Sequence, residues 1–186
     1  MIDWFLTRIL QKKALKKIVN PHKGRYVSLS DAQMVGFIVN AEIPGSAEAV
    51  NELKWVLQER KINYKGICVD LRKSPQGEAG FLSTPFMSII HRDNINWYGV
   101  PDEKIVTEFI PDHYDILIDL TAGKRLFAVD YILARADASL RIGISQSSPS
   151  PYDMFVSMGG DGVIKPEELM RNILIYLTTI HTDSKK

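Results

Sequence analysis

Two apolar runs with a helical segment between them dominate the hydrophobic pattern of residues 113–145. The runs at 114–120 and 140–145 are mostly apolar, which is typical of parallel strands that are buried on both faces. Between them, the segment from Gly123 to Arg135 repeats its apolar positions with helical spacing. The three segments form a βαβ unit and predict an α/β fold with parallel strands.

The same pattern occurs earlier in the chain. Residues 34–39 and 64–71 predict two more buried strands, and residues 46–61 predict the helix between them. Shorter segments complete the set: strands at 86–90 and 154–158, one or two helical turns at 102–109, an edge strand or a turn at 94–101, and a last helix that begins at Pro166.

The first segment of the chain, residues 2–19, predicts a helix that ends before Asn20. Its apolar positions follow a strict i+4 spacing, which drifts around a helix of about 3.6 residues per turn. The first two turns are therefore expected to contact something other than the last two. Three partners are open: the chain's own domain, a second subunit in a homodimer, and a membrane surface met by a basic amphipathic helix.

These elements predict a single three-layer, Rossmann-like α/β domain at residues 26–186, with a mostly parallel sheet of about five or six strands. Residues 1–25 are expected to form the N-terminal helix and a linker. A chain of 186 residues is long enough to bury a core without disulfides or metals. The single cysteine, Cys68, lies in an apolar run and is expected to be a buried, unreactive thiol.

Charge and composition exclude several classes of protein. A formal net charge of +1 is no footprint for nucleic acid, which usually requires a clearly basic face. No segment reaches the ~20 apolar residues of a transmembrane helix. The basic residues near the N-terminus follow the apolar run instead of preceding it, which is the reverse of a secretory signal. We therefore expect a cytoplasmic protein.

The sequence contains no complete catalytic motif of a known kind. A phosphate-binding loop ending at Gly123 and Lys124 would need glycine at position 118 and serine or threonine at position 125, where the chain has Ile118 and Arg125. The four histidines are scattered, without the spacing of a metal site. The sequence thus implies no cofactor and no metal.

Position in the fold indicates a site where motifs do not. Ligands of open parallel sheets bind at the carboxyl ends of the strands. The predicted ligand-binding residues at these ends are Asn40, Thr121, Gly123, Lys124 and Ser145. Thr121 is expected to cap the following helix, whose free amides and Lys124 would hold a small anionic ligand. In the alternative interpretation, Thr121 is only a cap and the lysine is solvated.

Two segments resemble known families. Residues 114–120 and 140–144 resemble the N-terminal, acceptor-side domain of lipopolysaccharide heptosyltransferases. This resemblance implies a Rossmann-like domain and transfer chemistry on a phosphorylated or sugar-like substrate, with Glu42 or Asp119 as base and Lys124 contacting the anion. Residues 96–101 are similar to a segment of short, uncharacterised bacterial proteins.

Two functions from different classes follow. The first is a non-catalytic binding or interaction domain, with contacts at the carboxyl edge of the sheet and at the N-terminal helix. The second is a glycosyltransferase-like half-enzyme. The first is favoured, because the chain has no room for the donor-binding domain of those transferases and shows no paired acid and base.

Overall fold

The computed structural model describes residues 2–18, 22–73, 81–110, 113–122, 125–144, 150–156 and 164–179. In chain order, its elements are α1 (Ile2–Lys16), β1 (Met34–Asn40), α2 (Ser46–Glu59), β2 (Asn63–Asp70), β3 (Met87–His91), η1 (Arg92–Asn94), α3 (Glu103–Phe109), β4 (Tyr114–Asp119), α4 (Phe127–Arg135), β5 (Ala138–Gly143), β6 (Met154–Phe155) and α5 (Pro166–Thr179).

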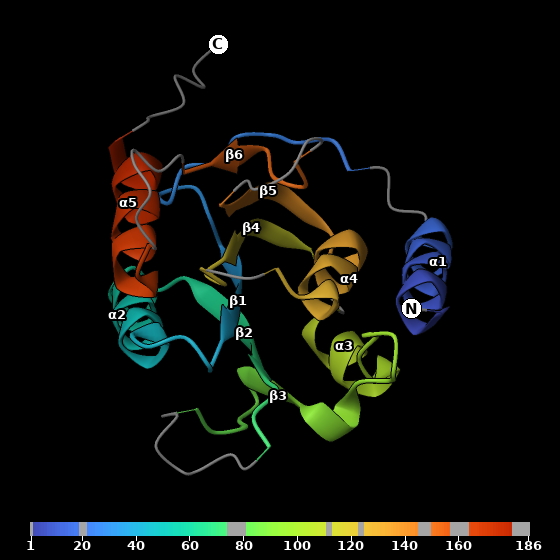
Figure 1. The fold of residues 1–186 in the computed structure, drawn as a ribbon. Helices are drawn as coiled ribbons and strands as arrows, with labels where there is room; N and C mark the ends of the chain where they lie inside the picture. Colours follow the sequence, from blue (N-terminus) through green and yellow to red (C-terminus); the bar gives the residue numbers. More distant parts are fainter. Residues whose placement is uncertain are drawn as a thin grey trace.

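The six strands form one parallel sheet in the order β3-β2-β1-β4-β5-β6 (Figure 1). The central strand is β1, which pairs with β2 on one side and with β4 on the other. At the middle of this ladder Phe37 lies opposite Gly66 of β2 and Ile118 of β4. The expected α/β class with a parallel sheet is confirmed.

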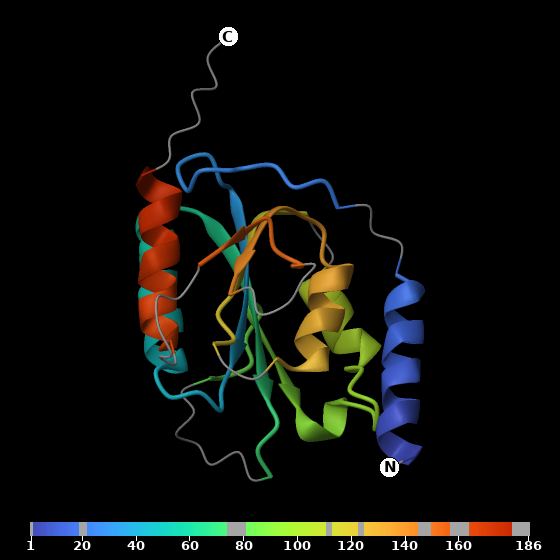
Figure 2. The same cartoon turned by 45° about the horizontal axis from the view of Figure 1, so that its top comes forward.

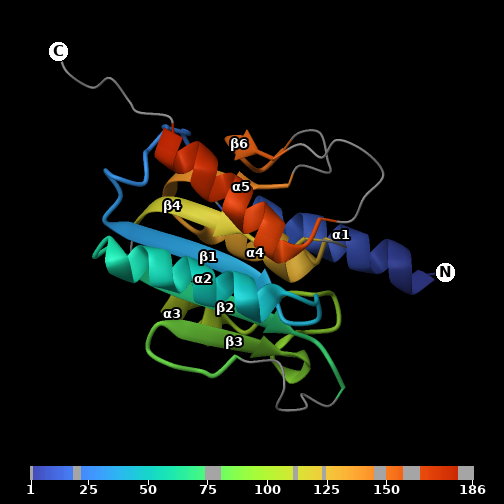
Figure 3. The same ribbon diagram turned by 90° about the vertical axis from the view of Figure 1, so that its left-hand side faces the viewer.

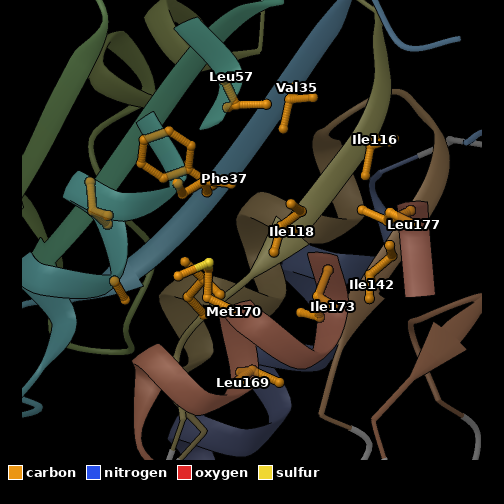
Figure 4. Close-up of a cluster of buried hydrophobic side chains, with 14 of the residues drawn as sticks. Val35, Phe37, Leu57, Ile116, Ile118, Ile142, Leu169, Met170, Ile173 and Leu177 are labelled. Carbon is orange, nitrogen blue, oxygen red and sulfur yellow. The ribbon is translucent and has the colours of Figure 1, made fainter. Parts of the chain in front are cut away.

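Helices cover both faces of the sheet, as a parallel sheet requires (Figures 1 and 2). Helices α2 and α5 pack side by side on one face, which Figure 3 views directly. Their buried residues join those of the strands in one hydrophobic cluster, which includes Phe37, Ile118 and Ile173 (Figure 4). Helices α3 and α4 cover the other face, where Leu117 and Ile132 belong to a second cluster. Helix α1 lies outside α4 as an additional layer (Figure 2).

Several elements differ from their predicted bounds. Helix α4 begins at Phe127 instead of Gly123, and its N-cap is Leu126, without a side-chain hydrogen bond. The prediction that Thr121 caps this helix is therefore wrong, because Leu126, five residues later, takes the N-cap position. Of the two alternatives predicted for residues 94–101, the structure has the turn, which a bridge between Ile95 and Pro101 closes. Helix α1 ends at Lys16, three residues early.

Cys68 and Pro166 lie as the sequence predicts. Cys68 is completely buried, and this burial raises its thiol pKa to about 12, so the thiol stays protonated at neutral pH. Pro166 is the first residue of α5, where its missing amide hydrogen costs nothing. Within the described residues, we find no helix that is both long and apolar enough to cross a membrane.

Gly66 allows β2 to pack closely against the ring of Phe37. A Cβ at position 66 would lie 2.3 Å from Phe37 Cε2 and 2.6 Å from the sulfur of Met87. Gly66→Ala should therefore lower the free energy of unfolding by about 1–3 kcal/mol through overpacking, as measured by urea denaturation. In a Phe37→Leu background the same substitution should cost less, because the smaller side chain leaves room for the methyl group. Equal costs in the two backgrounds would contradict this account.

Candidate functional site

The order of the strands places an opening at the carboxyl ends of β1 and β4. The connection after β1 leads to α2 on one face of the sheet, and the connection after β4 leads to α4 on the other (Figure 1). In doubly wound sheets this divergence forms the crevice where ligands bind. Asn40 is the last residue of β1 and Asp119 the last of β4, so both lie at the crevice.

Asp119 is buried, and both oxygens of its carboxyl group are hydrogen-bonded within the protein. Asp119 is only 4% exposed. The Oδ1 atom accepts hydrogen bonds from the backbone N–H of Thr121 at 2.8 Å and from its hydroxyl at 2.5 Å. The Oδ2 atom accepts one from the Tyr152 hydroxyl, also at 2.5 Å. Thr121 therefore fixes Asp119 instead of capping a helix.

Burial also sets the protonation chemistry of this group. Loss of water raises the pKa of Asp119, although the hydrogen bonds from Thr121 and Tyr152 oppose the shift. Loss of water, followed by the nearby Asp119 charge, raises the pKa of Tyr152 above its usual value. The phenol therefore stays protonated and acts as a hydrogen-bond donor, not as a nucleophile.

The structure adds Tyr152, which the sequence did not single out. A Cβ at Gly143 would lie 2.6 Å from the Tyr152 ring, so this glycine allows the ring to lie across the end of β5. Tyr152 and Asp119 are 33 positions apart and come from different connections. No local sequence pattern predicts the contact between Tyr152 and Asp119. The sequence offers one indication of it, the glycine at the end of a buried strand.

Asn40 shapes the loop between β1 and α2. Its side-chain oxygen accepts a hydrogen bond from the backbone N–H of Glu42 at 2.9 Å, and its backbone oxygen accepts one from the Ser46 hydroxyl at 2.7 Å. Gly45 completes the turn with a φ of 87°, a conformation that favours glycine. The side chain of Glu42 is exposed at the tip of this loop.

A bidentate ion pair lies at the end of the neighbouring strand β2. Arg72 donates from Nε to Asp70 Oδ1 at 2.8 Å and from Nη2 to Asp70 Oδ2 at 2.7 Å. The hydrogen bonds from Arg72 lower the pKa of Asp70, so this carboxylate is charged. The backbone N–H of Ala41 donates a hydrogen bond to the backbone oxygen of Val69 at 3.0 Å, so the start of the β1–α2 loop lies beside the end of β2.

Several carboxylates lie at the described part of this edge. Glu167 of α5 lies against Gly45, and its Oε2 is buried without a hydrogen-bond partner among the described residues. Across the crevice, Asp130 of α4 pairs with Arg125. Arg72 and Arg125 thus already have carboxylate partners. The carboxylates at this edge favour a ligand that donates hydrogen bonds, such as a polyhydroxylated molecule.

The predicted site residues therefore fall into two groups. Asp119 and Thr121 are hydrogen-bonded to each other, and Asn40 fixes the loop that carries Glu42. Gly123, Lys124 and Ser145 lie outside the described residues. In the described part of the chain, no three His, Cys, Asp or Glu side chains are grouped so that they could hold a metal ion.

Removal of the Tyr152 hydroxyl tests the network around Asp119. Tyr152→Phe leaves Oδ2 of a buried carboxyl group without its donor, so the free energy of unfolding should fall by about 1–3 kcal/mol at neutral pH. Tyr176→Phe, on the half-exposed surface of α5, is the matched control and should stay within about 0.5 kcal/mol of the wild type. Identical urea midpoints for both variants and the wild type would refute the network's role.

The raised pKa of Asp119 predicts a pH dependence of stability. The folded state keeps a proton that the unfolded state releases near pH 4, so wild-type stability falls as the pH rises from about 4 toward the folded-state pKa. Asp119→Asn removes this titration. The free energy of unfolding of the wild type minus that of Asp119→Asn should therefore decrease between about pH 4 and pH 7 in urea titrations.

An exposed carboxylate provides the control for that measurement. Asp93→Asn on η1 changes a carboxylate at an exposed position and should follow the wild-type dependence of stability on pH. If the difference between wild type and Asp119→Asn instead grows with pH, Asp119 is charged in the folded state, and the stated direction is wrong.

Comparisons with known proteins reach the level of the family. No curated protein and no solved structure matches this chain. Its residues 5–180 match a family described as "Family of unknown function (DUF6913)". This match includes most of α1, the whole parallel sheet and all of α5. The chain therefore belongs to the DUF6913 family, whose function is unknown.

Proposed function

We propose that this chain is a non-catalytic binding domain that takes a small, sugar-like ligand at the crevice between the β1–α2 and β4–α4 connections. The observation that carries the proposal is the divergence of these connections at the carboxyl ends of β1 and β4. The crevice has a fixed wall, because Asp119 is hydrogen-bonded to Thr121 and Tyr152. A cytoplasmic location and a single domain over residues 26–186 are parts of this proposal.

The charges at the edge support a ligand rich in hydroxyl groups. Glu42 offers an exposed carboxylate on a loop that Asn40 holds in place. Arg72 is 31% exposed, but Asp70 already balances its charge. An anionic group on the ligand, as expected from the sequence, has Lys124 as its candidate contact.

A glycosyltransferase-like half-enzyme is the second candidate. The resemblance of residues 114–120 and 140–144 to heptosyltransferases favours it, together with the acid at the end of β4. The geometry is less favourable, because a general base must reach the proton that it removes. Asp119 is buried and engages both oxygens internally, which leaves Glu42 as the accessible carboxylate.

A thermal-shift panel tests the binding function. It should contain neutral hexoses and heptoses, the same sugars as phosphates, nucleotide-sugars, and inorganic phosphate alone. A ligand at 100 times its Kd should stabilise the protein by about 2.7 kcal/mol and raise its Tm. Glu42→Gln should weaken that binding about 3- to 10-fold through the loss of one hydrogen-bond acceptor for the ligand.

The matched control is Glu108→Gln on α3, which precedes β4 and lies toward the opposite edge of the sheet. It should bind like the wild type. A panel without any sugar-dependent shift would overturn the proposal, as would equal binding by Glu42→Gln. Turnover of a nucleotide-sugar that Glu42→Gln abolishes would establish the half-enzyme instead.

A further inference from the structure

Helix α1 has one face against the domain and one face exposed to solvent. The domain-facing side contains the half-buried Leu10, Gln11 and Ala14, and Gln11 donates a hydrogen bond to the backbone oxygen of Tyr98 at 2.9 Å. A cavity of about 740 Å³ separates part of α1 from α4. The helix is thus attached at the side of the molecule as an outer layer (Figures 1 and 2).

The outer face of α1 is apolar over its first turns. Trp4 is 64% exposed, Phe5 62% and Ile9 45%. On a helix with 100° per residue these three side chains span about 140° of the surface, away from Leu10 and Ala14. Single exposed apolar residues are ordinary, whereas a group of this size on one helix face marks an interaction surface.

The following turns of the same face are basic. From Trp4 to Ile18 the sequence has no carboxylate and five cations; Arg8, Lys12 and Lys16 belong to this face, whereas Lys13 and Lys17 line the cavity beside α4. The guanidinium of Arg8 lies 4.6 Å above the centre of the Trp4 ring, where it joins the apolar and the basic halves. The partner of this face must therefore be apolar at one end and negatively charged at the other.

We propose that α1 docks this protein on a membrane surface that contains anionic lipid. The helix is about 22 Å long at 1.5 Å per residue, and it would lie in the plane of the interface. Trp4, Phe5 and Ile9 enter the boundary between headgroups and acyl chains, where tryptophan is preferred. Lys12 and Lys16 lie at the level of the lipid phosphates, which attract them.

Charge complementarity distinguishes this occupant from a second copy of the chain. A parallel pair of α1 helices would bring their cations together, and an antiparallel pair would set them against the apolar turns; in neither case does a carboxylate from Trp4 to Ile18 balance them. Nucleic acid would satisfy the lysines but would leave Phe5 and Ile9 without an apolar partner. An anionic bilayer satisfies both halves of the face.

The chain offers a matched control on the opposite side of the sheet. Trp55 of α2 is 63% exposed, almost the same as Trp4. However, α2 also carries the exposed acids Glu48 and Glu59, which an anionic surface repels. If exposed tryptophan alone caused binding, Trp4 and Trp55 would contribute equally.

Vesicle co-sedimentation of the full chain tests the proposal. The wild type should bind phosphatidylcholine vesicles with about one-third phosphatidylglycerol and should not bind phosphatidylcholine alone. Phe5→Glu and Ile9→Glu should lower the partition coefficient at least tenfold. Lys12→Gln combined with Lys16→Gln should lower it roughly 10- to 30-fold, and salt at about 0.5 M should have a similar effect.

The controls separate docking from folding. Two variants of the opposite side should bind like the wild type. One is Trp55→Glu, and the other combines Arg60→Gln with Lys61→Gln. All variants should keep the wild-type circular dichroism and Tm, because the altered side chains are exposed. In a Trp55→Phe and Trp97→Phe background, the remaining Trp4 should shift its emission to shorter wavelengths on anionic vesicles.

Three results would overturn the proposal. The first is no binding to anionic vesicles, or equal loss of binding by the α1 and α2 variants. The second is a dimer in light scattering that Phe5→Glu dissociates, which would assign the face to a second copy. The third is binding to double-stranded DNA that Phe5→Glu leaves unchanged. None of these measurements depends on a ligand at the carboxyl edge.

Discussion

The pairing of β1 with strands on both of its sides is the constraint on which the rest of the structure depends. Parallel neighbours cannot be joined by a tight turn, so each connection must cross a face of the sheet. Helix α2 crosses one face after β1, and α3 covers the other before β4. Because the sheet grows in opposite directions from β1, the crevice opens where β1 and β4 end.

Asp119 at the same edge is a buried carboxyl group that needs hydrogen-bond partners. A carboxyl group at the end of a covered strand is costly unless hydrogen-bond donors surround it. The loop after β4 supplies Thr121, and the segment before β6 supplies Tyr152. The hydrogen bonds of Asp119 therefore connect β4, the loop after it and the segment before β6. Ligand recognition is left to exposed neighbours such as Glu42.

Helix α1 does not pack on the sheet, because the other helices already cover both of its faces. It can only add a layer outside α4 (Figure 2). A helix in that position buries a narrow stripe, so Trp4 and Phe5 remain exposed. The molecule thus has two separate candidate surfaces, one at the carboxyl edge and one on α1.

The sequence by itself determined the strands and helices of the domain, because a doubly covered strand is a local apolar run and a proline such as Pro166 is a local helix signal. It also placed Asn40 and Asp119 at strand ends. Only the tertiary structure decided the strand order, the partner of Thr121 and the contact between Tyr152 and Asp119. These depend on which groups meet in space after folding, and residues 33 positions apart share no local pattern.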